Sequence, residues 1–258
     1  MARIHPSAVV DPAAELADDV EVGPCAVVGP HVRAGAGTSI AAHAVVTGRT
    51  RLGSRNRVFQ FASIGEIPQD RKYGGEPTTT TIGDDNVFRE YVTVHAGTVQ
   101  DRGDTQIGNG NLLLAYSHIA HDCVIGNFTT FSNSAQIAGH VHVDDWAVLG
   151  AFSGVHQFAR IGAHAMCAAF SVIPQDVPPF IMAHGYPVRP RGINAEGLRR
   201  RGFSNEDIMR LRRAYKTLYR DGLSLEDARR ELERAARDAP VLAPLVAFLA
   251  VPGRGIVR

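Results

Sequence analysis

An apolar residue occurs at every sixth position from Ile4 to Ile173, apart from two interruptions, and no other feature limits the possible folds as strongly. All 26 positions of this repeat are apolar. They are Ile4, Val10, Leu16, Val22, Val28, Ala34, Ile40, Val46, Leu52, Val58, Ile64, Ile82, Phe88, Val94, Ile107, Leu113, Ile119, Ile125, Phe131, Ile137, Val143, Leu149, Val155, Ile161, Cys167 and Ile173. In a chain that is 45% hydrophobic, chance would give such a run only about once in a billion trials.

A period of six matches neither the 3.6 residues of an α-helix nor the two-residue alternation of a simple strand. It is typical of a solenoid in which each hexad forms a short strand and a sharp corner, so that three hexads complete one triangular coil. The repeated residue then points inward and packs on its counterparts above and below. Glycine follows it in ten hexads, where a side chain would hinder the corner. The sequence therefore predicts a mainly β protein, a parallel β-helix of about nine coils.

The repeat ends at Ile173, which predicts two domains: a β-helix over residues 1–178 and a small α-helical domain over residues 179–258. Two polar segments, near 65–81 and 99–106, interrupt the repeat and are expected to project as loops. In the second domain, Ser204 with Asp207 and Ser224 with Asp227 have the spacing of capping boxes. Each precedes apolar residues at helical spacing, and residues 241–250 form a third apolar segment.

Charge divides the chain in the same place. Residues 1–178 carry 11 basic and 17 acidic side chains, whereas residues 179–258 carry 16 basic and 9 acidic ones. The second domain is therefore suited to an anionic ligand or an acidic partner. Only two lysines, Lys72 and Lys216, occur beside 25 arginines.

Several protein classes are not expected. No apolar run approaches the roughly 18 residues of a membrane span, so no integral membrane segment is predicted. The first residues lack the apolar stretch of a signal peptide, which favours a cytoplasmic location. The three cysteines, Cys25, Cys123 and Cys167, match neither a disulfide framework nor a zinc motif and are expected to be structural. No nucleotide-binding glycine loop occurs, so no cofactor is expected, and no nucleic-acid partner is expected either.

Six of the eleven histidines lie between residues 118 and 164. Because every eighteenth residue stacks in successive coils, His121 is expected above Gly139 and Gln157, and Asp122 above His140. A neutral imidazole can accept a proton at cellular pH, and a glycine can present an unobstructed N–H to an oxyanion. The alternative is that these are solvated side chains on the outside of a solenoid.

Six segments carry a resemblance to a known family. They are residues 60–78, 113–127, 138–145, 154–164, 175–179 and 193–204 (QFASIGEIPQDRKYGGEPT, LLAYSHIAHDCVIGN, AGHVHVDD, GVHQFARIGAH, QDVPP and INAEGLRRRGFS). Together they resemble the UDP-N-acetylglucosamine 3-O-acyltransferases, which perform the first step of lipid A biosynthesis. The resemblance covers nearly the whole chain, including both insertions. It implies a left-handed β-helix, against the usual right-handed crossover rule, and a homotrimer with active sites between adjacent prisms.

The resemblance also implies site residues. His121 matches the general base that takes the proton of the sugar 3-hydroxyl, Asp122 is a candidate for orienting it, and Gly139 matches the amide that stabilises the oxyanion. The donor is expected to be a 3-hydroxyacyl thioester of acyl carrier protein, and the acceptor UDP-N-acetylglucosamine. Asp70 and Lys72 match residues that bind the sugar, and further contacts to the sugar nucleotide are matched by His118, His140 and Gln157. Residues matching contacts to the uridine and phosphates are Asn194, Glu196, Arg200 and Arg201.

One further position concerns the acyl chain. In the family that this chain resembles, a residue in the last coils ends the acyl groove and limits chain length. That position corresponds to Ala169, which shares a column with Ala151 and Asn133. Alanine there implies a medium-length chain, and the alternative is that Ala169 only packs an interface.

Three other functions are alternatives for a chain with this repeat. The later N-acyltransferase of the same pathway has a separate domain before its β-helix, whereas the hexads here begin at Ile4. A β-helix of the carbonic anhydrase branch would need three histidines around zinc. The spacing of His118 and His121 does not match that branch, so no metal is expected. A non-catalytic β-helix scaffold is the third. The residues do not decide between a 3-hydroxyl and a 3-amino acceptor.

Overall fold

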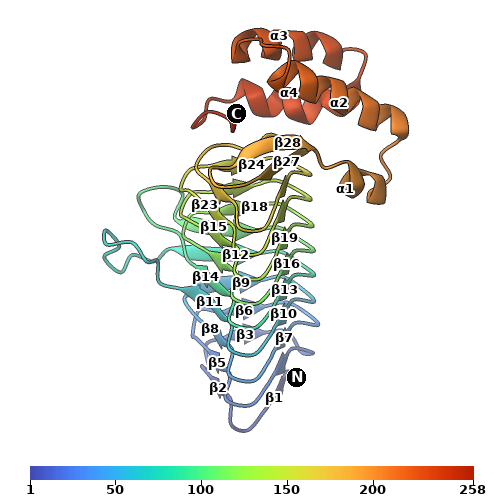
Figure 1. Ribbon diagram of the computed structural model, residues 1–258. Coiled ribbons are helices and arrows are strands. Elements are labelled where there is room, and N and C mark those ends of the chain that lie inside the picture. Colours follow the sequence, from blue (N-terminus) through green and yellow to red (C-terminus); the bar gives the residue numbers. More distant parts are fainter.

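The computed structural model describes residues 1–258 and contains a triangular prism with a group of helices at one end (Figure 1). Three parallel sheets form the sides of the prism, and the chain visits them in turn as it winds upward. The termini lie toward opposite ends of the molecule, because each coil stacks on the one before it.

The strands are short and belong to sheets A, B and C. Sheet A contains β1 (Arg3–Ile4), β4 (Glu21–Val22), β7 (Ser39–Ile40), β10 (Arg57–Val58), β13 (Val87–Phe88), β16 (Leu112–Leu113), β19 (Thr130–Phe131), β22 (Val148–Leu149), β25 (Met166–Cys167), β27 (Ile181–His184) and β28 (Arg189–Ile193). Sheet B contains β2 (Val9–Val10), β5 (Val27–Val28), β8 (Val45–Val46), β11 (Ser63–Glu66), β14 (Thr93–His95), β17 (His118–Ile119), β20 (Gln136–Ile137), β23 (Gly154–Val155) and β26 (Val172–Ile173). Sheet C contains β3 (Glu15–Leu16), β6 (Arg33–Ala34), β9 (Arg49–Leu52), β12 (Thr79–Ile82), β15 (Asp104–Ile107), β18 (Val124–Ile125), β21 (His142–Val143) and β24 (Arg160–Ile161).

The hexad residues form the core. Each strand typically pairs in parallel with the strand in the same place on the next coil, as Ile119 does with Ile137. Every hexad residue from Val22 to Ile173 is buried, which confirms the expected inward column. The first three are less buried, and Ile4 is 45% exposed, because the first coil has a neighbour on one side only. Each fully buried aliphatic side chain contributes roughly 1.5–3 kcal/mol, so the column is the main stabilising element.

Two coils are longer than the rest, and the parallel pairing continues across both, with one register shift between β11 and β14 after Ile64. Arg57 pairs with Val87, and Val87 pairs in turn with Leu112, so both steps along the chain exceed the length of a regular coil. The additional residues form two loops between sheets B and C, residues 67–78 and residues 96–103. Strands β12 and β15 begin within the segments expected to be loops, because Thr79 pairs with Asp104.

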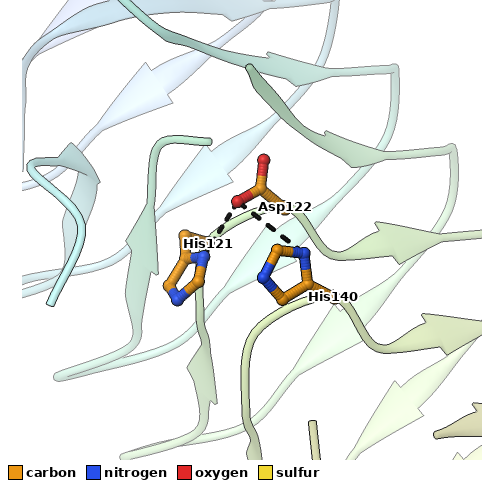
Figure 2. A group of neighbouring side chains, drawn as sticks. All are labelled: His121, Asp122 and His140. Carbon is orange, nitrogen blue, oxygen red and sulfur yellow. Dashed lines mark hydrogen bonds and ion pairs between the residues drawn. The ribbon is translucent and has the colours of Figure 1, made fainter. Parts of the chain in front are cut away.

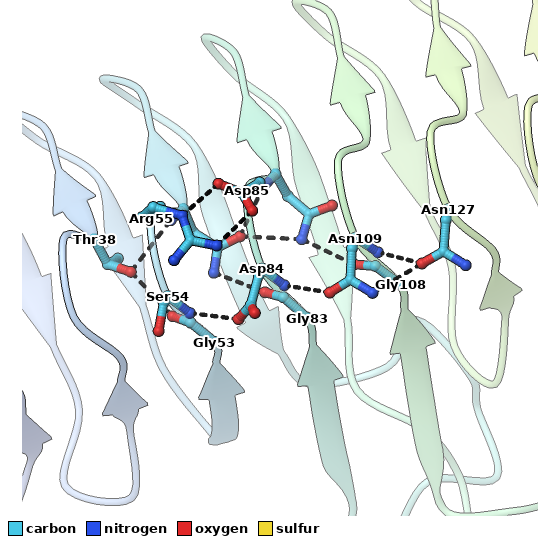
Figure 3. A network of polar contacts seen from close by, with 12 residues as sticks. Thr38, Gly53, Ser54, Arg55, Gly83, Asp84, Asp85, Gly108, Asn109 and Asn127 are labelled. Atoms are coloured by element: carbon cyan, nitrogen blue, oxygen red, sulfur yellow. Dashed lines mark hydrogen bonds and ion pairs between the residues drawn. The ribbon is translucent and has the colours of Figure 1, made fainter.

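Hydrogen bonds between polar groups run from coil to coil (Figure 3). One column of polar side chains is buried beside the apolar core. The amide oxygen of Asn56 accepts hydrogen bonds from the backbone N–H and the side-chain amide of Asn86, both at 3.0 Å. The amide oxygen of Asn86 accepts two more from Asn111, both at 2.9 Å. Each of the three side-chain amides also donates to a backbone carbonyl at a neighbouring corner. All three residues are at most 1% exposed, so the column satisfies polar groups that water cannot reach.

Two of the three cysteines are buried, as expected of structural thiols. Cys123 and Cys167 are fully buried and burial raises the pKa of each thiol to about 12, whereas Cys25 is exposed at a corner. Thiols with raised pKa values are poor nucleophiles.

The last coil leads into a cap and then into the helices. Strand β27 pairs in parallel with β25 and antiparallel with β28, so sheet A continues to Ile193. The helices are α1 (Ala195–Arg200), α2 (Asn205–Tyr219), α3 (Leu225–Ala236), the 3₁₀ helix η1 (Pro240–Leu242) and α4 (Ala243–Ala250). Ser204 and Asp207 form the predicted capping box, and the Ser224 hydroxyl accepts from the backbone N–H of Asp227. None of these helices has the length and apolar composition to cross a membrane.

The helices form a second core of 13 buried residues. This core is joined to the prism by Arg160, whose guanidinium bonds Asp176 at 2.8 Å and the carbonyl of Val251 at 3.1 Å. Asp176 is buried, and its carbonyl also accepts from the N–H of Val257. The chain end therefore returns to the last coil.

Removing one member of the asparagine column should destabilise the protein. We expect Asn86→Ala to lower the free energy of unfolding by about 3 kcal/mol, because buried groups of Asn56, Asn111 and Gly108 lose partners and each such loss costs roughly 1–3 kcal/mol. The exposed Asn109 bonds Asp84 and Asn127 in a parallel surface column. Asn109→Ala is therefore the matched control, with an expected change within about 0.5 kcal/mol. Urea denaturation measures both, and equal effects would contradict a role for burial.

Candidate active site

His121 and Asp122 stand at the corner between β17 and β18. Successive residues of a strand point to opposite faces, but Asp122 has a φ of 58°, in the left-handed region. This conformation turns its carboxylate toward the imidazole, and Oδ2 lies 2.8 Å from Nδ1 of His121 (Figure 2). The corner thus permits the contact that an extended strand would prevent.

The environment of the pair determines which nitrogen of His121 is free. Asp122 is fully buried, and the Thr98 backbone N–H and hydroxyl both donate to its carboxylate. These hydrogen bonds compensate the cost of burying the group. Because the carboxylate is an acceptor, the neutral imidazole places its hydrogen on Nδ1 and leaves Nε2 available as a base.

Gly139 lies directly beside the His121 ring, as the stacking of successive coils predicts. A Cβ at position 139 would lie 2.5 Å from Cε1 and 2.7 Å from Nε2 of His121, so only glycine fits there. The N–H of Gly139 donates to no group within the chain. The base nitrogen and an available N–H donor are therefore neighbours.

His140 lies in the same corner column as Asp122, one coil further along the chain, as expected. Its backbone N–H donates to the carbonyl of His121 at 3.0 Å, and its ring stacks on Phe158 with the ring centroids 4.4 Å apart. Its Nδ1 lies 2.8 Å from Oδ2 of Asp101, in the second loop. The ring stands perpendicular to that of His121 at 5.0 Å (Figure 2).

His118 lies on β17, shortly before His121 in the chain. Its Nδ1 is 2.7 Å from the Thr93 hydroxyl, and its ring meets His95 edge-on at 4.8 Å. Burial, followed by the charges of His95 and His121, lowers the pKa of His118 to about 4. Burial also lowers the pKa of His95. Both imidazoles are therefore neutral hydrogen-bonding groups near pH 7.

An open groove of about 390 Å³ lies beside His118 on sheet B, among Gln136, Gly154, His156 and Val172. The groove contains apolar and small residues and runs toward the later coils. Gln157, in the same column as Gly139, is exposed close to its rim. A chain with an apolar tail fits such a surface better than a fully polar ligand does.

The remaining expected residues lie apart from His121. Asp70 and Lys72 lie in the first loop, which projects from the prism (Figure 1). Asp70 Oδ1 accepts from the backbone N–H of Lys72, and the Lys72 ammonium makes no ion pair within the chain. No hydrogen bond or ion pair joins this loop to His121. The structure of one chain does not bring these residues together.

Helix α1 and the residues that flank it contain the positions expected to contact the uridine and phosphates. Asn194 is 4% exposed and caps α1, accepting from the N–H of Gly197 and donating to the carbonyl of His164. Glu196 pairs with Arg200 at 3.2 Å. The Arg201 guanidinium lies 5.2 Å from the Trp146 ring centroid, and its buried Nη1 has no hydrogen-bond partner. Burial lowers the pKa of Arg201.

His121, Asp122 and His140 also form a three-residue group whose potential ligand atoms lie within 4.8 Å of one another. One contact within the group is already a hydrogen bond, between Asp122 and His121. Asp122 also accepts from Thr98, and His140 Nδ1 bonds Asp101. A shared cation would have to break them. The arrangement fits proton transfer between hydrogen-bonded groups better than coordination.

Sequence reasoning missed Thr98, Asp101 and His95. Thr98 and Asp101 belong to a loop that follows no repeat, so no stacking rule located them beside Asp122 and His140. His95 directly follows the hexad residue Val94. Its place in the repeat is that of an ordinary corner residue, so the sequence did not mark it as part of the site.

Known proteins are similar to this chain over its whole length. The family model described as Udp N-acetylglucosamine O-acyltransferase, domain 2, matches residues 176–257, and the bacterial transferase hexapeptide model matches residues 104–139. An acyl-[acyl-carrier-protein]–UDP-N-acetylglucosamine O-acyltransferase from Thiobacillus denitrificans is 56% identical over 258 residues, which span the whole of both chains. The chain belongs to this O-acyltransferase family.

Solved members of the family have the same fold. LpxA from Acinetobacter baumannii superimposes with a TM-score of 0.96 at 45% identity, over 99% of each chain. The UDP-N-acetylglucosamine acyltransferase from Francisella novicida gives a TM-score of 0.97 at 41% identity, over 99% of this chain and 94% of that one. The family identification from sequence motifs and the fold class, a left-handed parallel β-helix with a C-terminal α-helical part, are confirmed. The protein is an acyltransferase.

The burial of His118 in this acyltransferase leads to a pH prediction. We expect its imidazole to stay neutral from about pH 8 to about pH 5.5, because its pKa is about 4 rather than roughly 6.5 as in an unfolded chain. Between these two pKa values the unfolded chain binds more protons, so the contribution of His118 to stability falls as the pH drops from about 6.5 toward 4 and is complete above 6.5. Nuclear magnetic resonance titration of histidine-labelled protein checks this, and a His118 midpoint near 6.5 would refute it.

Proposed function

We propose that the protein transfers a 3-hydroxyacyl chain from acyl carrier protein to the 3-hydroxyl of UDP-N-acetylglucosamine, the first step of lipid A biosynthesis. Full-length relatives carry the names of these two substrates. The observation that carries the chemistry is the His121–Asp122 pair beside Gly139, since it combines a base with an N–H donor.

In the proposed reaction, Nε2 of His121 takes the proton of the sugar 3-hydroxyl as its oxygen attacks the thioester carbonyl carbon. The C–O bond forms, and the carbonyl oxygen becomes an oxyanion that accepts a hydrogen bond from the Gly139 N–H. The C–S bond then breaks, and the leaving thiolate takes the proton back from His121. Asp122 stabilises the imidazolium that forms in between and keeps its orientation. Atoms and charges balance, so this route uses neither cofactor nor metal.

The nucleotide sugar would be held by side chains around this pair. We assign His118, His140 and Gln157 to the sugar, together with Asp70 and Lys72 of the projecting first loop. Asn194, Glu196, Arg200 and Arg201 are assigned to the uridine and phosphates, because an arginine guanidinium presents N–H donors that match phosphate oxygens. The distance of the first loop from His121 fits a homotrimer in which adjacent prisms share each site. We also propose that the protein is located in the cytoplasm.

The product tests the function directly. Protein is incubated with UDP-N-acetylglucosamine and a mixture of 3-hydroxyacyl carrier proteins of different lengths. Mass spectrometry should show a single acyl chain added to the nucleotide sugar, and mild alkali should release it, since esters hydrolyse far faster than amides. Transfer only to the 3-amino analogue would refute the assignment of UDP-N-acetylglucosamine as acceptor. Absence of transfer from any carrier would refute the assignment of the acyl carrier protein as donor.

The role of His121 can be tested by substitution. We expect His121→Ala to lower kcat by ~10²-fold or more, because proton transfer by a positioned side chain contributes at least that much. Binding of the nucleotide sugar, measured by calorimetry, should change little. His31→Ala is the control, because His31 is exposed on an early coil, and its kcat should equal that of the wild type. If the kcat of His121→Ala stayed within about threefold of the wild-type value, His121 would not be the general base.

Ala169 is the proposed limit to acyl-chain length. It is half-buried and stacks on Ala151, where the N–H of Phe170 donates to the Ala151 carbonyl at 2.9 Å. The rings of Phe152 and Phe170 stack beside this column with centroids 5.1 Å apart. Small residues therefore adjoin an aromatic surface.

Substitution at Ala169 should change the preferred donor. We expect Ala169→Gly to favour longer chains and Ala169→Met to favour shorter ones, because each buried methylene is worth about 0.8 kcal/mol. Two carbons beyond the optimum should then lower kcat/KM roughly 10-fold. Rates with a donor series of increasing length measure this. An unchanged optimum in both variants would mean that Ala169 only packs an interface.

A further inference from the structure

The second loop, residues 96–103, has no part in the reaction described above, yet it bonds Asp122 and His140 beside the candidate base. It leaves sheet B after β14 and closes on itself, because the carbonyl of Thr98 accepts from the N–H groups of Gly103 at 3.0 Å and Asp101 at 3.3 Å. Gly97 has no room for a side chain, since a Cβ there would collide with the backbone of Asp104. The loop is thus a compact turn held against the corner of the prism.

Thr98 binds the carboxylate of Asp122 through two donors. Its hydroxyl lies 2.6 Å from Oδ2, and its backbone N–H lies 2.9 Å from Oδ1 and 3.1 Å from Oδ2. Thr98 and Asp122 are both fully buried. The same Oδ2 is the atom that bonds Nδ1 of His121. The direction in which Asp122 presents this oxygen therefore depends on Thr98.

Asp101 of the same loop bonds His140 directly, as Asp122 bonds His121. Its Oδ2 lies 2.8 Å from Nδ1 of His140, whereas Oδ2 of Asp122 is 4.0 Å from that nitrogen. Asp101 is therefore the closer acceptor, and it directs Nε2 of His140 away from the loop. One short segment thus holds both imidazoles of the candidate site, His121 through Asp122 and His140 directly.

We propose that the second loop is a positioning element in which Thr98 and Asp101 select the Nδ1-protonated forms of His121 and His140. The inference rests on the proposed function, because it assigns the loop to the same reaction. Thr98 fixes the acceptor that keeps the hydrogen on Nδ1 of His121 and leaves Nε2 as the base. Asp101 keeps the unprotonated Nε2 of His140 toward the sugar. A displaced or wrongly protonated imidazole loses catalytic power although every catalytic residue is still present.

The decisive variant is Thr98→Val, which keeps the shape and removes the hydroxyl. We expect kcat to fall about 10-fold, as a small misplacement of a reacting group costs up to about 100-fold, while KM for the nucleotide sugar stays within about twofold. Thr98→Ser retains the hydroxyl and should restore kcat to within about threefold of wild type. Asp101→Ala should instead raise KM for the nucleotide sugar about 10-fold, because His140 is assigned to binding.

A spectroscopic measurement separates positioning from general damage. Nitrogen-15 shifts of histidine-labelled protein, recorded without substrates, should show His121 protonated on Nδ1 in the wild type and a mixture of both forms in Thr98→Val. Thr129→Val is the matched control: Thr129 is 1% exposed and its hydroxyl donates to Asn111 Oδ1 at 2.7 Å, but it lies in the asparagine column. That control should keep the wild-type tautomer and kcat even if it is less stable.

The outcomes distinguish this inference from the proposed function. An unchanged His121 tautomer and an unchanged kcat in Thr98→Val would overturn the positioning role, whatever His121→Ala does. Equal losses of kcat in Thr98→Val and Thr129→Val would overturn it too, since both would then reflect loss of stability. Full activity of His121→Ala would refute the base itself, and that result does not depend on any loop variant.

Discussion

Hydrogen bonds between the strands of successive coils determine where nearly every other group of this protein lies. Each coil is paired over only two or a few residues per side, so no single strand could hold its position alone. The pairing persists because the inward residue of each hexad packs on the residue one coil away, as Ile119 does on Ile137. Register and core therefore support each other: a shift by one residue would turn the aliphatic column outward.

This constraint explains how the prism contains long loops and buried polar groups without losing its form. The two long coils resume pairing at Val87 and Leu112, because the next hexad residue restores the apolar contact. The asparagine column follows the same register across both loops, with Asn86 bonding Asn56 of the preceding coil and Asn111 of the next one. Loops can therefore vary in length while the corner that carries His121 keeps its place.

The same register sets what the sequence can predict. The hexads located the core, and the stacking of coils placed Gly139 beside His121 and His140 beyond Asp122, since both follow from counting along the chain. Counting fails where the chain leaves the repeat. Thr98 and Asp101 belong to such a segment, so their contacts with Asp122 and His140 depend on loop closure, which no period describes.

Asp70 and Lys72 show a second limit. Their loop projects from the prism, and no contact within one chain connects it to the His121 corner. Their expected role came from motif resemblance alone. Asp122 shows a third limit. Successive residues of an extended strand face opposite ways, and the left-handed conformation at this corner, which allows the contact with His121, does not follow from the hexad period.

That conformation is common in this fold, and it connects stability with the site. Seventeen residues other than glycine have positive φ, and twelve of them carry a ring. Each such residue costs about 1–2 kcal/mol, and stacking along a corner offsets part of that cost, as between Tyr91 and Tyr116 at 4.8 Å. In the corner column of Asp122 the rings of His140 and Phe158 still stack, but Asp122 itself replaces a ring with a carboxylate. Hydrogen bonds to Thr98 and His121 offset the backbone strain of Asp122 instead. The corner residue without a ring is therefore the one that orients the base.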